Sequence, residues 1–299
     1  MGISKFSFHP RAVIHAVADR SVYFFIEHAP AFVDSMIFTL LHNFSRKSFR
    51  YPRMNQAIVT VLRHNDIGSY LVMVKSLIWV TKYNYRFFVL SDGTLTSSDI
   101  HTLRQHHGIT VYIPPVPKKW QLWRWQAIKY CSPKTLFPNE HVILADADIL
   151  FYKTPGELLR KNVCVFSDDI KSWYALSNVE SQHYLHRTPI EKMNTGLLSI
   201  DTQYIEPRLF ETLLTTVSHI QKTRSVDDHV IEQTAYAILF RAMQKRTRVR
   251  RLSAGYLMFP KIHTTDNHPH PSCIHFTGYY ETERRFYTIV LLIKTAIFH

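Results

Sequence analysis

Short apolar runs alternate with longer amphipathic segments from residue 57 onward. Three runs rich in β-branched or aromatic residues predict strands at residues 57–62, 85–90 and 109–113, the first of them buried. The segments between them have helical length and spacing, which predicts helices at residues 69–82 and 98–107. This alternation predicts an α/β fold with a mostly parallel sheet and helices on both faces, whose ligands bind beyond the carboxyl ends of the strands.

Two aspartates follow a fourth predicted strand. After a predicted helix at residues 120–130, the apolar run at residues 141–144 leads into the sequence Ala145-Asp146-Ala147-Asp148. Two carboxylates at the end of a buried strand can bind one hard divalent cation, Mg²⁺ or Mn²⁺, and this cation can bridge the phosphates of a nucleotide. In the alternative interpretation, one aspartate caps the next turn and the other faces solvent. The position at a strand end favours the metal site.

A small polar segment precedes another apolar run at residues 197–200. Asn194 and Thr195 carry an amide and a hydroxyl that can orient sugar hydroxyls, and Gly196 permits close approach of the backbone. Taken alone, the segment is more typical of a turn.

Two further polar groups lie in the second half of the chain. Glu232 and Gln233 come near the start of a predicted helix at residues 230–240, where the helix dipole favours a carboxylate without any function. His275 ends a short apolar run and can be either a third metal ligand or a structural hydrogen-bonding residue.

The order and spacing of these segments resemble the glycogenin-like, retaining glycosyltransferase family 8, with its bacterial lipopolysaccharide galactosyl- and glucosyltransferases. The resemblance covers residues 55–281 and lies in the segments AIVTVL, WRWQAIKY, ILADADILF, MNTGLLSID, IEQTAYAIL, YLMFP and IHFTG. It implies a GT-A fold, a Rossmann-like, mostly parallel mixed sheet flanked by helices, at residues 54–285. A helical N-terminal extension at residues 1–53 and an apolar C-terminal tail at residues 286–299 complete the expected organisation.

The resemblance also implies an activity, the transfer of a hexose from a nucleotide sugar, UDP-glucose or UDP-galactose, to a hydroxyl of a glycan or glycolipid with retention of configuration. The implied metal ligands, for Mn²⁺ or Mg²⁺, are Asp146, Asp148 and His275. The residues expected around the sugar and its reacting carbon are Asn194, Thr195, Glu232 and Gln233. The other expected donor contacts are Leu62, His64 and Asp66 in the nucleoside loop, together with Arg124, Ala147, Gly278 and Arg284.

The chain departs from the family pattern at two places. Glu281 stands where the family has a lysine that binds the diphosphate, so we expect Arg284 or Arg285 to replace it or the phosphate clamp to be built differently. Arg63-His64-Asn65 stands in the nucleoside loop where acidic and amide residues are usual, which leaves the choice of base open.

The charge of the chain predicts an anionic partner. The 36 lysines and arginines exceed the 23 aspartates and glutamates by 13, and residues 241–251 hold six cations. This run suggests a nucleic-acid-binding protein as one alternative, but no recognisable nucleic-acid motif accompanies it. A catalytically inactive GT-A-shaped scaffold is the other alternative, since Glu281 replaces an expected cation.

Location is predicted from the cysteines and the apolar segments. Cys131, Cys164 and Cys273 form no C-x-x-C pair and no secretory signal is visible, so we expect a cytoplasmic protein. The apolar stretches at residues 22–44 and 286–299 are interrupted or too short to span a bilayer. Either they lie peripherally on an anionic membrane or they pack on the main domain.

Overall fold

The computed structural model describes residues 51–106, 108–115, 124–169, 174–206, 228–258 and 271–276, with scattered positions between 208 and 219. Residues 1–50 of the predicted extension and the predicted tail at residues 286–299 lie outside this described part. None of the helices in the described ranges is both long and apolar enough to cross a membrane.

The predicted βαβαβ beginning is confirmed. Its elements are β1 (Arg53–Leu62), α4 (Ile67–Thr81), β2 (Asn84–Ser91), α5 (Ser97–Arg104) and β3 (Ile109–Tyr112). The three strands pair in parallel, with β2 between β1 and β3. Thr96 and Asp99 form a reciprocal capping box that begins α5, and Lys82 ends α4 in the left-handed conformation.

The second half of the chain adds both parallel and antiparallel strands. Its elements are α6 (Arg124–Leu136), β4 (His141–Ala145), β5 (Ile149–Phe151), β6 (Val163–Asp168), α7 (Asn178–Leu185), β7 (Met193–Asp201), α9 (Asp228–Met243), β8 (Arg248–Arg251), β9 (Tyr256–Met258) and β10 (Cys273–His275). The short helical turns η1 (His64–Asp66) and η3 (Thr202–Tyr204) follow β1 and β7.

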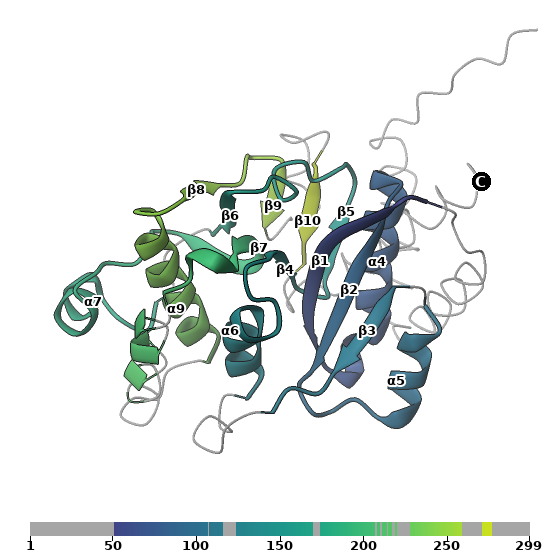
Figure 1. Ribbon diagram of the computed structural model, residues 1–299, viewed down its shortest axis with the longest axis horizontal. Coiled ribbons are helices and arrows are strands. Elements are labelled where there is room, and N and C mark those ends of the chain that lie inside the picture. Colours follow the sequence, from purple (N-terminus) through teal and green to yellow (C-terminus); the bar gives the residue numbers. More distant parts are fainter. Residues whose placement is uncertain are drawn as a thin grey trace, which may run out of the picture.

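Seven strands form one mixed sheet in the order β3-β2-β1-β4-β7-β6-β8 (Figure 1). All neighbours in it are parallel except β7, which runs antiparallel to both β4 and β6. A small second sheet has the order β5-β10-β9. The predicted fold class, a mostly parallel mixed sheet flanked by helices, is therefore confirmed.

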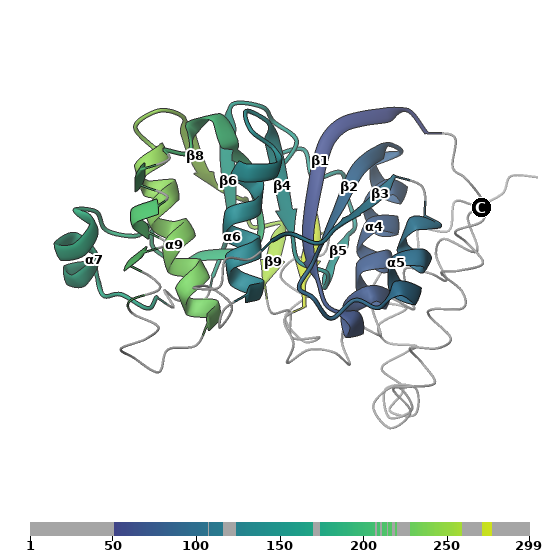
Figure 2. The ribbon, with the colours of Figure 1, turned by 60° about the horizontal axis from the view of Figure 1, so that its bottom comes forward.

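Helices cover both faces of the large sheet. Successive side chains of β1 point to opposite faces, so this one strand contributes to two cores. Ile58 and Leu62 pack in the core that contains α4 and residues of β5 and β10, whereas Ala57, Val59 and Val61 pack in the core that contains α6 and α9. Figure 2 shows α6 and α9 side by side, in agreement with their contacts. The ends of β4 and β10 carry the polar residues Asp146, Asp148 and His275.

Candidate metal centre

Strand pairing brings Asp146, Asp148 and His275 together. The two aspartates lie between the end of β4 and the start of β5, and β5 pairs antiparallel with β10 so that Ile149 is opposite His275. The backbone N–H of Phe276 donates to the carbonyl of Asp148 at 3.0 Å, which continues this pairing past His275. Two segments more than 120 residues apart in the chain thus converge on one point.

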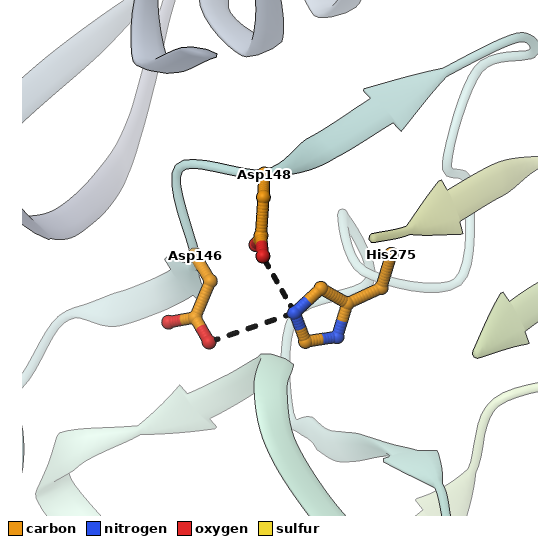
Figure 3. A group of neighbouring side chains, drawn as sticks. All are labelled: Asp146, Asp148 and His275. Carbon is orange, nitrogen blue, oxygen red and sulfur yellow. Dashed lines mark ion pairs between the residues drawn. The ribbon is translucent and has the colours of Figure 1, made fainter. Parts of the chain in front are cut away.

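The three side chains point toward one another (Figure 3). His275 Nε2 lies 3.1 Å from Asp148 Oδ1 and 3.7 Å from Asp146 Oδ2, and one ligand atom from each of the three residues lies within 4.8 Å of the others. Burial by itself lowers the pKa of the His275 imidazole, yet the charges of Asp148 and then Asp146 outweigh burial and raise this pKa above its ordinary value. Two half-buried carboxylates and one buried histidine are therefore concentrated at one point.

This donor set fits a divalent cation. Asp148 Oδ1 is buried and, apart from its ion pair with His275, has no hydrogen-bond partner among the described residues. Such an oxygen is costly to leave without a cation or a donor. Carboxylates are the ligands that Mg²⁺ and Mn²⁺ prefer, and the added imidazole favours Mn²⁺, which is the softer ion of the two.

Gly196 makes room for the histidine. A Cβ atom built on Gly196 would lie 1.9 Å from Cε1 and 2.5 Å from Nδ1 of the His275 ring. The backbone here is irregular, since the register between β6 and β7 jumps from Phe166–Leu198 to Ser167–Asn194. Asn194 and Thr195, which the sequence placed before a strand, thus lie inside the bulged part of β7. Any side chain at position 196 would displace the imidazole.

A buried lysine that no sequence motif marks lies beside the metal ligands. Lys129 Nζ donates to Asp146 Oδ1 at 2.7 Å and lies 3.3 Å from Glu232 Oε1. Burial alone would lower the pKa of the Lys129 ammonium, but Asp146 and Glu232 outweigh it and raise this pKa. Burial also raises the pKa of the Glu232 carboxyl to about 7, against the opposing effect of Lys129. The chain Asp146–Lys129–Glu232 therefore couples the metal centre to the first turns of α9.

A second polar cluster connects β7 to α9. Asp169, directly after β6, accepts from Gln233 Nε2 at 3.2 Å and from Asn194 Nδ2 at 3.4 Å. The Asn194 side-chain oxygen accepts from the N–H of Gly196 at 2.7 Å. All these side chains are buried, so their orientation is fixed. Asp169 was not predicted as a site residue, whereas Asn194 and Gln233 were.

The predicted nucleoside loop has its own network at the end of β1, where Leu62 is fully buried. His64 Nδ1 lies 2.7 Å from Asp99 Oδ2, and Arg63 Nε donates to Asp66 Oδ2 at 2.8 Å. The hydrogen bond with Asp66 raises the pKa of the Arg63 guanidinium, and Asp148 adds a smaller effect of the same sign. The loop is therefore within electrostatic reach of the metal ligands.

The remaining predicted residues are placed less completely. Ala147 lies buried between the two aspartates, and Arg124 is the first residue of α6, but the Arg124 side chain lies outside the described part of the structure. Gly278 and Arg284 also lie outside the described residues. The cation that α6 contributes to the described site is Lys129, more than one helical turn after Arg124.

No family model and no curated protein sequence matches the chain. Solved structures do match. One is the galactosyltransferase LgtC in complex with donor and acceptor sugar analogs, at 15% identity and a TM-score of 0.51, over 78% of this chain and 94% of that one. An active-site mutant of LgtC matches at 13% identity and the same TM-score, over 78% and 95% of the two chains. The bifunctional glycosyltransferase WbbM, in its apo form, matches at 13% identity with a TM-score of 0.49, over 75% of this chain and 46% of WbbM. The two LgtC matches show that the fold is that of GT-A glycosyltransferases.

Proposed function

We propose that the chain is a metal-dependent glycosyltransferase that moves a hexose from a nucleotide sugar to a hydroxyl of a glycan or glycolipid. UDP-glucose or UDP-galactose is the proposed donor, and the proposed outcome is retention of configuration. The observation that carries the proposal is the Asp146, Asp148 and His275 group, which lies at the carboxyl end of β4 in a GT-A fold. In support, a structure of LgtC, which shares this fold, holds donor and acceptor sugar analogs.

The chemical difficulty of such a transfer is the loss of a diphosphate. A Mn²⁺ or Mg²⁺ ion held by Asp146, Asp148 and His275 would supply a Lewis acid against the charge that grows on the leaving phosphate. The chain's own contribution is to hold the ligands in place. Lys129 fixes one oxygen of Asp146 and leaves Oδ2 facing His275. The departing diphosphate takes the proton of the acceptor hydroxyl, so no strong general base is required.

The sugar-facing residues come from β7 and α9. Asn194 and Gln233 both donate to Asp169, which fixes their amide groups for hydrogen bonds to sugar hydroxyls. Glu232 is buried beside Lys129 and, with a pKa of about 7, exists in both protonation states near neutral pH. We assign Glu232 and Gln233 to the reacting carbon and Thr195 to the sugar site.

The proposal is tested by a thermal-shift panel of UDP-, GDP- and dTDP-sugars, each with and without Mn²⁺. A ligand that binds only the folded state raises the melting temperature. We expect the largest rise with a UDP-sugar in the presence of Mn²⁺ and its loss in Asp148→Ala. No rise with any nucleotide sugar would contradict the proposal. NMR of the product's anomeric proton then tests retention.

The same preparation separates the alternatives. Nucleotide-sugar binding without turnover would favour an inactive scaffold, and salt-dependent binding of DNA or RNA would favour a nucleic-acid-binding protein. A cytoplasmic location with peripheral contact to an anionic membrane stays a prediction, which fractionation of cells and co-sedimentation with anionic vesicles would test.

A further inference from the structure

A groove of about 780 Å³ lies at the opposite end of α9 from Glu232. Its walls come from α7 and the loop after it, from the segment after η3, and from the last turn of α9 and the residues beyond. Figure 1 shows α7 beside α9 and away from β5 and β10, which position the metal centre. Along α9, Arg241 lies about 14 Å beyond Glu232. The groove is therefore separate from the site described above.

Positive charge converges on this groove from three segments. The described residues that line it include four permanent cations and one carboxylate: Arg187, Arg208, Arg241, Lys245 and Glu206. The dipole at the end of α9 accounts for Arg241 and Lys245 without any ligand. It does not account for Arg187 and Arg208, which belong to other segments.

Among the described residues, no carboxylate forms an ion pair with these four cations. Within the described part of the chain, Arg187, Arg208 and Lys245 form no ion pair or side-chain hydrogen bond, and Glu206 pairs instead with Arg246, at 3.6 Å. Arg241 is held by the Pro189 carbonyl and the Gln244 side chain, at 3.4 Å and 3.1 Å. Like charges that converge without a partner repel one another, so this arrangement is complementary to an anion.

The size and chemistry of the groove indicate the class of anion. Its volume is within the range of about 300–1,000 Å³ that small-molecule sites have. Arginine forks match phosphate oxygens in pairs, and the half-exposed Tyr184 ring adds an apolar face on the same wall. A concave site with one aromatic ring fits a phosphorylated sugar better than the flat surface of a bilayer.

We propose that this groove binds a phosphate or diphosphate group carried by the acceptor glycan. The identity of the ligand as an acceptor rests on the proposed function, whereas the anion site does not. Phosphate at this position would anchor one end of a long acceptor, about 14 Å from Glu232 measured along the α9 axis, and leave its other end free to reach the metal centre. The +13 balance of the chain then serves in part to recognise an anionic acceptor.

The test measures binding of inorganic pyrophosphate by calorimetry, in EDTA so that a metal site cannot contribute. The groove variant is Arg187→Gln/Arg208→Gln, and the matched control is Arg104→Gln/Arg160→Gln, which removes two exposed arginines elsewhere. We expect the groove variant to weaken binding at least about tenfold, because two charge-assisted contacts are lost. The control should change it less than about twofold.

Glu206→Gln provides a change in the opposite direction. Removing the one described carboxylate of the groove should tighten pyrophosphate binding a few fold, an effect that a misfolded variant would not produce. Equal weakening by both double variants, or no measurable pyrophosphate binding, would overturn the proposal. Groove-dependent binding of phosphatidylglycerol vesicles without pyrophosphate binding would overturn it in favour of a membrane surface.

The same proteins distinguish this inference from the proposed function. Hydrolysis of a nucleotide sugar in the absence of an acceptor reports on the metal centre and needs no groove. We expect Arg187→Gln/Arg208→Gln to leave this hydrolysis unchanged and to raise KM for a phosphorylated acceptor. Loss of pyrophosphate binding with unchanged KM for that acceptor would overturn the acceptor assignment alone.

Discussion

Gly196→Ala tests the packing that positions the metal ligands. The added methyl group would lie 1.9 Å from Cε1 of His275, whereas carbon atoms in contact are normally about 3.5–4.0 Å apart. The imidazole would therefore have to move by about 2 Å, because the backbone of β7 is held by strands on both sides. Nε2 would leave the point on which the two aspartates converge.

The structure sets the expected magnitude. Overpacking in a buried strand costs about 1–3 kcal/mol, and disturbing the support of a metal ligand costs about 10–100-fold in metal affinity. The assays are urea unfolding of the metal-free protein and calorimetric titration with Mn²⁺. Gly68→Ala is the matched control, because its added Cβ on α4 would have no atom within 4 Å other than those of its chain neighbours and its own helix backbone. It should leave Mn²⁺ affinity unchanged.

A double-mutant cycle refines this test. In a His275→Ala background the ring is absent, so Gly196→Ala should cost less than about 0.5 kcal/mol there. If Gly196→Ala destabilises the protein equally in both backgrounds, the reasoning from the His275 contact is wrong. Unchanged Mn²⁺ affinity in Gly196→Ala would refute the assignment of His275 as a ligand.

Three further predictions concern the charges of the site. Lys129→Met should destabilise the protein by about 3–5 kcal/mol in urea unfolding, because Asp146 and Glu232 lose their buried partner; the exposed Lys161→Met is the control and should be neutral. The pKa of Glu232 is raised to about 7 in the folded state, whereas the unfolded chain releases this proton near pH 4.5. The free energy of unfolding should therefore fall as the pH rises from 4.5 to 7, by up to about 3 kcal/mol. The raised pKa of His275 should also make the metal-free protein lose stability as the pH rises above the ordinary pKa of histidine. The difference in stability between wild type and Glu232→Gln at each pH isolates the contribution of Glu232. Identical pH profiles of the two proteins would contradict this assignment. Mn²⁺ at about 100 times its dissociation constant should stabilise wild type by about 2.7 kcal/mol and not Asp148→Ala, while EDTA reverses the gain; equal stabilisation of both would exclude Asp148 as a ligand.

The parallel half of the fold could be predicted because its signals are local. The β-branched run of β1 and the capping box of α5 each specify their element within a few residues. Asp146 and Asp148 were recognisable for the same reason, since they follow directly on a buried strand. His275 could be named as a candidate ligand, but its contact with Asp148 depends on the pairing of β5 with β10.

Lys129 and Asp169 could not be found in this way. Lys129 looks like an ordinary polar residue of an amphipathic helix, and its two carboxylate partners lie 17 and 103 residues away in the chain. Asp169 follows β6 in no motif that marks it, and its partners Asn194 and Gln233 lie 25 and 64 residues away in the chain. Both become site residues only when antiparallel β7 and helix α9 fold back against the parallel half.

The structural role of the cations at residues 241–251 could not be predicted from the sequence either. Its spacing suggested a nucleic-acid surface, but four of its residues form β8, an edge strand that pairs in parallel with β6. Charged side chains are typical of sheet edges, and Arg251 pairs with Asp168 at 3.3 Å. Part of the run therefore belongs to the edge of the sheet, which charge counting alone could not separate from a binding surface.

The central claim is tested most directly by metal-dependent release of UDP from UDP-glucose and UDP-galactose. We predict that wild type releases UDP with Mn²⁺ but not with EDTA, and that Asp146→Ala and Asp148→Ala each reduce the rate at least about a hundredfold, because the ligands of the Lewis acid are lost. Asp168→Ala, a change to a half-exposed aspartate that pairs with Arg251 and is not one of the metal ligands, should keep the wild-type rate. Undiminished, metal-independent release by both ligand variants would contradict the account.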